Sequence, residues 1–282
     1  MSEATLPWAV RLFEKSVLKQ AKWRRLSGLL ALPDPAARFE ALDLGSDNGV
    51  ISWLFRRRGG RWRSADLDPK SVGSIRELVG SEVYQIDGRS VPFADASLDA
   101  IVVVDMLEHV HTDRELVLDL CRALRPGGRL VLNVPHRKRW SLLRPLRDAL
   151  GLTDAWHGHL RPGYRAGELA ALLPPGLRVE RCESYSRFFS ELLDIALNLA
   201  VTRGTGAASG AKGVVLTGAE LARHEKSFRL YSAVYPLCWL WARLDALIPF
   251  CSGYMLALSA VKQPAGAGPP RAAADQPRST LA

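Results

Sequence analysis

The sequence predicts an α/β fold with a mostly parallel sheet of seven strands and helices on both of its faces. Short apolar runs alternate with amphipathic segments between residues 41 and 134, as strands do when crossover helices join them. The run at residues 100–104 is apolar throughout and rich in β-branched residues, which indicates a strand buried on both faces. Hydrophobic residues form 48% of the chain and charged residues 24%, so a sizeable core is expected.

The strands and helices of this core are expected in strict alternation. The first five expected strands are residues 41–44, 62–65, 83–86, 100–104 and 130–134, and the helices between them are residues 50–55, 72–79 and 115–124. Pro126, Gly127 and Gly128 stop the last of these helices. A helix at residues 168–173, a sixth strand at 177–185 and a seventh at 254–262 complete the predicted core.

Two segments lie outside this alternation. Residues 7–32 have the periodicity of one basic amphipathic helix, which Pro33 and Pro35 end. Residues 188–201 and 221–247 are predicted to be apolar helices joined by a Gly/Ala/Ser-rich loop at 204–213. The expected units are a basic N-terminal helix at 1–35, a core at 36–188, a helical insertion at 189–252, the last core strand at 253–263 and a disordered tail at 264–282.

Charge and cysteine usage restrict the class of protein. A formal net charge of +9 favours acidic partners: nucleic acid, anionic headgroups or phosphorylated substrates. The cysteines are widely separated and show no CxxC spacing, so we expect neither a disulfide framework nor a metal site. Charged residues interrupt the apolar residues near the N-terminus, which argues against a signal peptide and favours a cytoplasmic location.

The first motif is Asp43-Leu-Gly45-Ser-Asp-Asn-Gly49, between the first strand and the first core helix. Ligands of open α/β sheets bind outside the carboxyl ends of the strands, and glycines let the backbone approach a ligand closely. Asp66 ends the second strand, where an acid accepts hydrogen bonds from ribose hydroxyls. The GxGxxG fingerprint is absent and the loop carries Asp47, which argues against a dinucleotide.

Three further motifs follow in order. They are Asp87-Gly88 after the third strand, Asp105-Met-Leu-Glu108-His109-Val110 after the fourth, and Leu124-Arg-Pro126-Gly127-Gly128 before the fifth. In this order and context, the five motifs resemble the Rossmann-like class I S-adenosylmethionine-dependent methyltransferases. The similarity is greatest to the small-molecule (type 11) branch that contains the ubiquinone-pathway O-methyltransferases, and it covers about residues 38–136.

The resemblance implies S-adenosyl-L-methionine as the cofactor and assigns residues to it. The glycine loop would contact the methionine part through Asp43, Gly45 and Gly49, Asp66 would lie at the ribose, and the adjacent Leu67 would be a further cofactor-binding residue. Asp87 and Gly88 would lie at the adenine, and Asp105 would face the cofactor. The chain departs from the family at Asp47, where a glycine is common. Each aspartate could instead cap a helix or a turn.

Two histidines are candidates for the base that a hydroxyl acceptor needs. They are His109, just after the fourth strand, and His159 in His157-Gly-His159-Leu-Arg161-Pro-Gly-Tyr164. Similar segments lie beside the substrate in related methyltransferases, so we expect Arg161 and Tyr164 to line the acceptor site. The alternative for both histidines is a purely structural role.

The insertion predicts the kind of acceptor. Residues 230–261 are apolar and aromatic, but charges and prolines interrupt them, so a transmembrane span is not expected. A lid over the acceptor is the first interpretation. A peripheral contact with an anionic membrane, shared with the basic helix at 7–32, is the second. Both favour a small hydrophobic or lipid-linked acceptor, such as a quinone precursor or a glycan intermediate.

Other functions stay open at this stage. A non-catalytic binding or regulatory protein could retain the same fold. The net charge suggests a nucleic-acid methyltransferase, but the Pro-Pro-aromatic motif of enzymes that methylate exocyclic base amines is absent after the fourth strand, where the chain has Asp105-Met-Leu. A cytosine C5 enzyme would carry Pro-Cys there, so nucleic acid is not the expected partner. An NAD-linked oxidoreductase is a more distant alternative.

Overall fold

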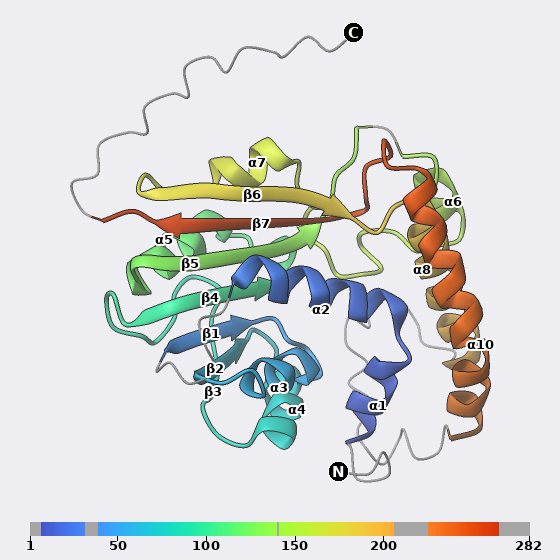
Figure 1. The fold of residues 1–282 in the computed structure, drawn as a ribbon, viewed down its shortest axis with the longest axis horizontal. Helices are drawn as coiled ribbons and strands as arrows, with labels where there is room; N and C mark the ends of the chain where they lie inside the picture. Colours follow the sequence, from blue (N-terminus) through green and yellow to red (C-terminus); the bar gives the residue numbers. More distant parts are fainter. Residues whose placement is uncertain (1–6, 32–38, 140, 206–224, 265–282) are drawn as a thin grey trace, which may run out of the picture.

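A computed structural model describes residues 7–31, 39–139, 141–205 and 225–264 of the chain. Its centre is a seven-stranded sheet in the order β3-β2-β1-β4-β5-β7-β6, in which only β7 runs antiparallel to its neighbours (Figure 1). The strands are β1 (Glu40–Leu44), β2 (Arg61–Asp66), β3 (Val83–Gln85), β4 (Leu98–Val104), β5 (Leu124–Pro135), β6 (Leu177–Tyr185) and β7 (Met255–Lys262). The predicted α/β fold and its strand number are confirmed.

Helices cover both faces of this sheet (Figure 1). One face packs on α1 (Trp8–Glu14), α2 (Val17–Leu30) and α3 (Val50–Arg56), and the other on α5 (Asp113–Ala123) and α7 (Ala166–Ala171). Side chains of a strand point alternately to the two faces. Accordingly, Ile101 and Val103 belong to one buried cluster, whereas Val102 and Val104 belong to the other. Helix α4 (Pro69–Val79) packs beside β3, and α6 (Arg144–Ala149) was not predicted.

The N-terminal segment differs from its prediction, because it forms two helices and not one. Lys15 and Ser16 make i→i−3 hydrogen bonds to Leu12 and Phe13, and Ser16 has extended backbone angles. The Gln20 side chain donates to the carbonyl of Glu14 at 2.6 Å, which satisfies an acceptor that the end of α1 exposes. Apolar residues keep their helical spacing across this turn, so the periodicity alone did not reveal it.

Strand β5 is also longer than predicted. It begins at Leu124 and not at residue 130, so Pro126, Gly127 and Gly128 lie within the strand. Its pairing with β4 shifts register between Leu98 and Ala100, which accommodates this irregular start. Helix α5 ends at Ala123, before the proline and glycines that were expected to stop it.

The insertion forms two neighbouring helices, α8 (Phe188–Thr205) and α10 (Glu225–Arg243), followed by a short 3₁₀ turn at Leu244–Leu247. In Figure 1 the pair stands at one end of the sheet, beside α2. Most of the predicted loop at 204–213 and nearly all of the predicted tail at 264–282 lie outside the described residues. Within the described parts, every helix is too short or too polar to cross a bilayer.

The first prediction concerns Phe55, which connects α3 with β2 and α2. Its ring is fully buried, stacks on Trp62 at 4.3 Å and meets Trp23 edge-on at 4.9 Å. Phe55→Ala should lower the free energy of unfolding by about 3–5 kcal/mol, because the substitution removes buried apolar area and leaves a cavity. Urea unfolding followed by tryptophan fluorescence measures the loss.

Leu118→Ala on α5 is the control, since Leu118 is 47% exposed. It should change the free energy by less than about 0.5 kcal/mol. Equal losses in the two variants would show that the packing of Phe55 does not hold these elements together.

Candidate cofactor and acceptor site

The carboxylate of Asp43 lies at the end of β1 and has no exposed surface. It accepts hydrogen bonds from Ser46 in the following loop at 2.6 Å, from Ser52 on α3, and from Ser64 on β2 at 2.9 Å. Arg56 lies 3.7 Å from the same carboxylate. Burial raises the pKa of Asp43 above its usual range, and the hydroxyls and Arg56 act in the opposite direction. The Asp43 side chain therefore holds the loop from behind, and its predicted cofactor contact stays a prediction.

The glycine loop has the backbone conformation that the sequence predicted. Gly45 and Gly49 have φ values of 80° and 78°, and Asp47, where the family often has glycine, also lies in the left-handed region with φ of 55°. A Cβ on Gly45 would lie 2.2 Å from the carbonyl oxygen of Val104 on β4. The loop therefore packs directly on the neighbouring strand, where a side chain at Gly45 would push it away.

Asp66 joins this loop to the end of β2. Its carboxylate accepts hydrogen bonds from the amides of Leu67 at 2.7 Å and of Asp47 at 3.4 Å, and the residue is 8% exposed. The chain pairs β1 with β2 in parallel, so Gly45 and Asp66 lie at the same edge of the sheet. Asp66 thus lies where a ribose contact was expected, next to the loop and with a small accessible surface.

Asp87 and Gly88 form a turn after β3. The exposed carboxylate of Asp87 accepts hydrogen bonds from the amides of Arg89 and Ser90, and these bonds lower its pKa. Gly88 has φ of 79°, and a Cβ there would lie 3.1 Å from the Leu67 side chain. Leu67 and Gly88 are therefore neighbours, as a shared adenine contact requires.

Asp105, at the end of β4, is the centre of a buried polar chain. It has φ of 45° and accepts a hydrogen bond from the side-chain amide of Asn133 at 2.6 Å. Tyr185 in turn donates to Asn133 at 2.6 Å. Lys22 on α2 forms an ion pair with Asp105. Partial burial disfavours the charge on Lys22, but the charge and hydrogen bond of Asp105 prevail and raise the pKa of Lys22.

A cavity of about 340 Å³ opens beside Asp105, and we call it the acceptor cavity. Helices α2, α6 and α8 and the segment after β5 contribute to its walls. The basic residues that line it are Lys19, Lys22, Arg137, Lys138, Arg144 and Arg147. The acidic ones are Asp105, Glu108, Asp148, Asp154, Glu191 and Asp194, and His136, His157 and His159 complete the ionisable set. The cavity thus carries many ionisable side chains, with both signs of charge represented equally.

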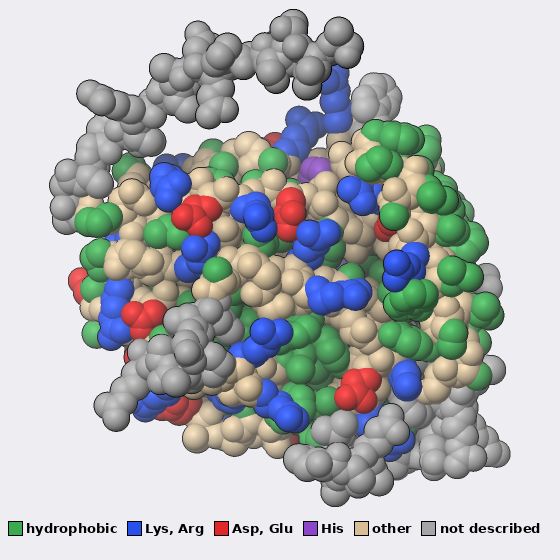
Figure 2. Space-filling view, viewed as in Figure 1, with side chains coloured by type: hydrophobic (Ala, Val, Ile, Leu, Met, Phe, Trp, Pro, Cys, Tyr) green, Lys and Arg blue, Asp and Glu red, His purple; other side chains and the backbone are tan. Residues whose placement is uncertain are grey.

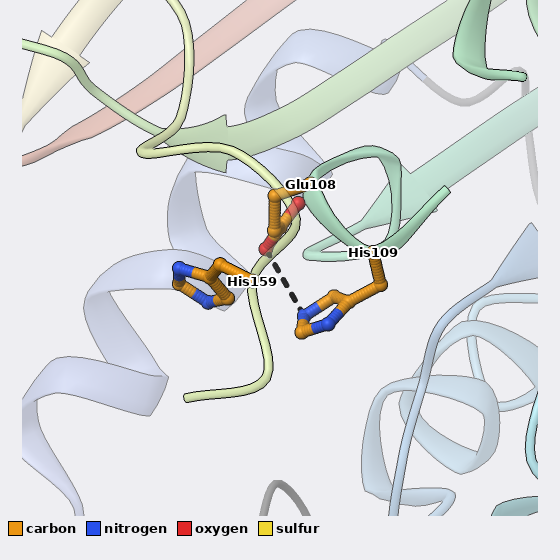
Figure 3. Close-up of side chains that lie close together, drawn as sticks. All are labelled: Glu108, His109 and His159. Atoms are coloured by element: carbon orange, nitrogen blue, oxygen red, sulfur yellow. Dashed lines mark ion pairs between the residues drawn. The ribbon is translucent and has the colours of Figure 1, made fainter. Parts of the chain in front are cut away.

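Glu108, His109 and His159 lie close together (Figure 3), and Glu108 and His159 also line the acceptor cavity. The Nδ1 atom of His109 lies 2.8 Å from the carbonyl oxygen of Gly158, which places its proton on Nδ1 and leaves Nε2 as the basic nitrogen. This Nε2 atom is 3.8 Å from the buried Glu108 carboxylate. The two histidine rings lie 4.9 Å apart.

Each of these three residues offers a ligand atom, and the atoms lie within 4.8 Å of one another. Two imidazoles and a carboxylate form a donor set that divalent metals accept. The sequence predicted no metal site on the basis of the cysteine spacing, and His159 follows the adjacent pair Glu108 and His109 only after a long separation in the chain. That prediction stays untested, and the same three side chains also suit acid–base chemistry.

Arg161 and Tyr164 are not among the residues that line the acceptor cavity, and their predicted role in acceptor binding stays a prediction. The Tyr164 hydroxyl is buried, donates to Asp113 at 2.8 Å and lies 3.1 Å from the carbonyl oxygen of Leu107. Arg161 forms an ion pair with the same aspartate and donates to the carbonyl of Val110 at 2.8 Å. Both side chains therefore clamp the segment that carries Glu108 and His109 onto the start of α5.

Sequence reasoning missed two groups of site residues. It assigned the lysines of the N-terminal segment to a membrane surface, whereas Lys22 reaches the end of β4. It also passed over Asn133, which is fully buried in an otherwise apolar strand. A buried amide needs a partner, so a polar residue within the predicted strand at 130–134 was the available signal.

Known proteins share this domain. Residues 42–132 match a family described as a methyltransferase domain. An uncharacterized methyltransferase from Mycobacterium sp. (strain KMS) is 31% identical over 146 residues, which cover 46% of this chain and 58% of the relative. The demethylmenaquinone methyltransferase of Tropheryma whipplei (strain Twist) is 30% identical over 129 residues, which cover 44% and 53%. The chain spans about half the length of the curated relatives it matches.

A solved structure extends the likeness beyond the matched residues. The [4+2]-cyclase SpnF aligns with a TM-score of 0.55 at 17% identity, over 88% of this chain and 83% of the cyclase. At that identity the likeness shows the fold alone. The family match and the relatives support the methyltransferase domain that the motifs predicted at about residues 38–136.

The second prediction tests the clamp by Tyr164. Tyr164→Phe should lower the free energy of unfolding by about 1–3 kcal/mol, because the buried carboxylate of Asp113 and the Leu107 carbonyl lose a donor. Chemical denaturation measures this loss. Tyr84→Phe on β3 is the control, since Tyr84 is only partly buried and should change the free energy little. If Tyr164→Phe is as stable as the control, the Tyr164 hydroxyl does not stabilise this segment, and the predicted role in acceptor binding is favoured.

Proposed function

We propose that the protein transfers the methyl group of S-adenosylmethionine to a small acceptor held in the acceptor cavity. The observation that carries this proposal is the position of Asp105. It lies at the same edge of the sheet as Gly45 and Asp66, and it also lines the cavity. The predicted cofactor residues and the cavity thus share one side chain, as methyl transfer between two adjacent ligands requires.

The residues present suit the cofactor. Asp66 would hold the ribose hydroxyls, the loop from Gly45 to Gly49 would lie against the methionine part, and the neighbouring Leu67 and Gly88 would contact the adenine. When bound, the cofactor supplies a methyl group on a positively charged sulfur. The carboxylate of Asp105 would favour that charge, and Lys22, the ion-pair partner of Asp105, would meet the cofactor's own carboxylate.

His159 is the proposed base for the acceptor. Its ring lines the cavity, and its Nδ1 atom lies 3.9 Å from the carboxylate of Asp154. A carboxylate beside an imidazole favours the protonated ring and orients it, as in other base–carboxylate pairs. His109 would support this role from the adjacent ring, with Glu108 behind it. The geometry therefore favours removal of a proton from a hydroxyl or amine.

The charge of the cavity suggests the chemistry of the acceptor. Its balanced acids and bases suit a polar, ionisable group. A hydrophobic or lipid-linked acceptor fits if its reactive end is polar and its apolar part lies outside, as in a quinone precursor or a lipid-linked glycan. Helix α8 supports the lid interpretation, because Glu191 and Asp194 form part of the cavity wall. A cytoplasmic enzyme with peripheral contact to the inner face of the membrane is the location that we propose.

The third prediction tests the cofactor site through thermal unfolding. S-adenosylmethionine or S-adenosylhomocysteine at 100 times its Kd should stabilise the protein by about 2.7 kcal/mol. Asp66→Ala should abolish most of the upward shift in Tm. Asp68→Ala, two residues further along and exposed, should retain it. A folded wild-type protein with no shift would favour a non-catalytic binding or regulatory role.

The fourth prediction concerns the base. In an assay of methyl transfer from labelled cofactor to a panel of phenolic and lipid-linked acceptors, His159→Gln should lower kcat by about 10²–10⁴. The thermal shift with S-adenosylmethionine should remain, since His159 does not belong to the cofactor loops. His111→Gln is the control, because His111 is exposed. An unchanged kcat in His159→Gln would remove this residue from the reaction.

A further inference from the structure

The outer surface of residues 233–250 is almost entirely apolar, and we call it the apolar face. It comprises the second half of α10, the 3₁₀ turn and the segment that follows. Its exposed residues are Ala233, Val234, Pro236, Leu237, Trp239, Leu240, Trp241, Arg243, Ala246, Leu247, Pro249 and Phe250. Arg243 is the single charged residue among them. Figure 2 shows the hydrophobic side chains gathered along this edge of the molecule.

Several large apolar side chains of this face are mostly exposed and do not pack within the protein. Leu237 is 66% exposed, Leu240 58% and Phe250 83%. Other residues of α10 are already used for packing, since Cys238 is buried and Trp241 donates to the carbonyl of Phe189 at 2.9 Å. A contiguous apolar surface of this kind marks a contact with a membrane or a partner.

Arginines border the apolar face on its side toward α2. A surface pocket of about 200 Å³ is lined by Arg24 and Arg25 of α2, by Arg187, and by Arg243. We call it the basic pocket. Asp245 is the acid among its lining residues, and its carboxylate accepts the amides of Arg187, Phe189 and Ser190 at the start of α8. The pocket thus has an excess of positive charge beside an apolar surface.

We propose that the apolar face and the basic pocket together dock the protein on an anionic membrane surface. The apolar side chains would enter the boundary between headgroups and acyl chains, and the arginines would bind headgroup phosphates. Trp239 suits that boundary, because an indole combines an apolar ring with a polar N–H. Arg243 stacks over Trp239 at 4.4 Å, which joins the two parts of the surface.

A second copy of the chain fits this surface less well than a membrane does. In a symmetric dimer formed through the apolar face, both basic pockets would border the interface. The arginines of the two copies would then approach one another. The exposed residues of the face offer no acidic side chain to compensate. An anionic membrane matches both parts of the surface, because its headgroups complement the arginines and its acyl chains accept the apolar side chains.

Helix α2 connects this surface with the acceptor cavity. Lys19 and Lys22 line the acceptor cavity, whereas Ala21, Arg24 and Arg25 line the basic pocket. The two hollows are therefore separated by one helix, with Tyr185 and Ser186 lining both. Docking would place the acceptor cavity close to the lipid surface. The inference deepens the membrane contact proposed above, and its test does not require methyl transfer.

The test is flotation of the full chain with vesicles of phosphatidylcholine alone or with one third phosphatidylglycerol. The wild-type protein should bind the anionic vesicles and lose binding at high salt. Leu237→Glu with Leu240→Glu should weaken binding at least tenfold. Arg24→Gln with Arg243→Gln should weaken binding to anionic vesicles by roughly tenfold or more, because each arginine near the surface contributes about a fivefold factor.

Leu118→Glu is the matched control, because Leu118 is also about half exposed but lies on α5. It should bind vesicles like the wild-type protein. Absence of vesicle binding by the wild-type protein, or an equal loss in Leu118→Glu, overturns the proposal. Sedimentation velocity that shows a dimer, converted to a monomer by the two glutamates, would assign the face to a second copy and also overturn it. The thermal shift with S-adenosylmethionine is measured on the same proteins. If the shift is retained while vesicle binding fails, the docking proposal is wrong but the proposed cofactor site is not affected.

Discussion

The carboxylate of Asp43 is the constraint on which the cofactor edge of the sheet depends. An ionised carboxylate without exposed surface is costly unless hydrogen bonds and a counter-charge satisfy it. Here three hydroxyls and Arg56 do so, and they come from the loop, from α3 and from β2. The Asp43 carboxylate therefore joins the loop, α3 and β2 at one point. Gly45, with its positive φ, and the contact between Asp66 and the loop lie beside this point.

A second polar chain joins the two halves of the sheet. Tyr185 at the end of β6, Asn133 on β5 and Asp105 after β4 are connected by hydrogen bonds, and Lys22 closes the chain from α2. Fully satisfied networks of this kind specify one arrangement of a core, because each unpaired member would be expensive. This network also holds α2 against the edge of the sheet where β4 ends. Helix α2 therefore forms a wall of the acceptor cavity in addition to covering the sheet.

The helical insertion has two different sides. Helix α8 contributes acidic side chains to the acceptor cavity, whereas α10 presents an apolar surface to the outside. The proposed lid and the proposed membrane contact, which the sequence left as alternatives, would thus use two different helices of one insertion. A polar cavity next to an apolar surface suits an acceptor with a polar reactive end and an apolar remainder.

The sequence by itself determined the α/β fold, the number of strands, the glycine loop and the position of Asp66, because periodicity, turn residues and short spacings along the chain are local signals. It did not determine which distant side chains would meet. Lys22 and Asp105 are 83 residues apart, and Tyr164 reaches Asp113 across 51. Asp43 belonged to a recognisable motif, yet only the packing of α3 and β2 buried it. Such pairings depend on burial and distance in three dimensions, so only the tertiary structure decided them.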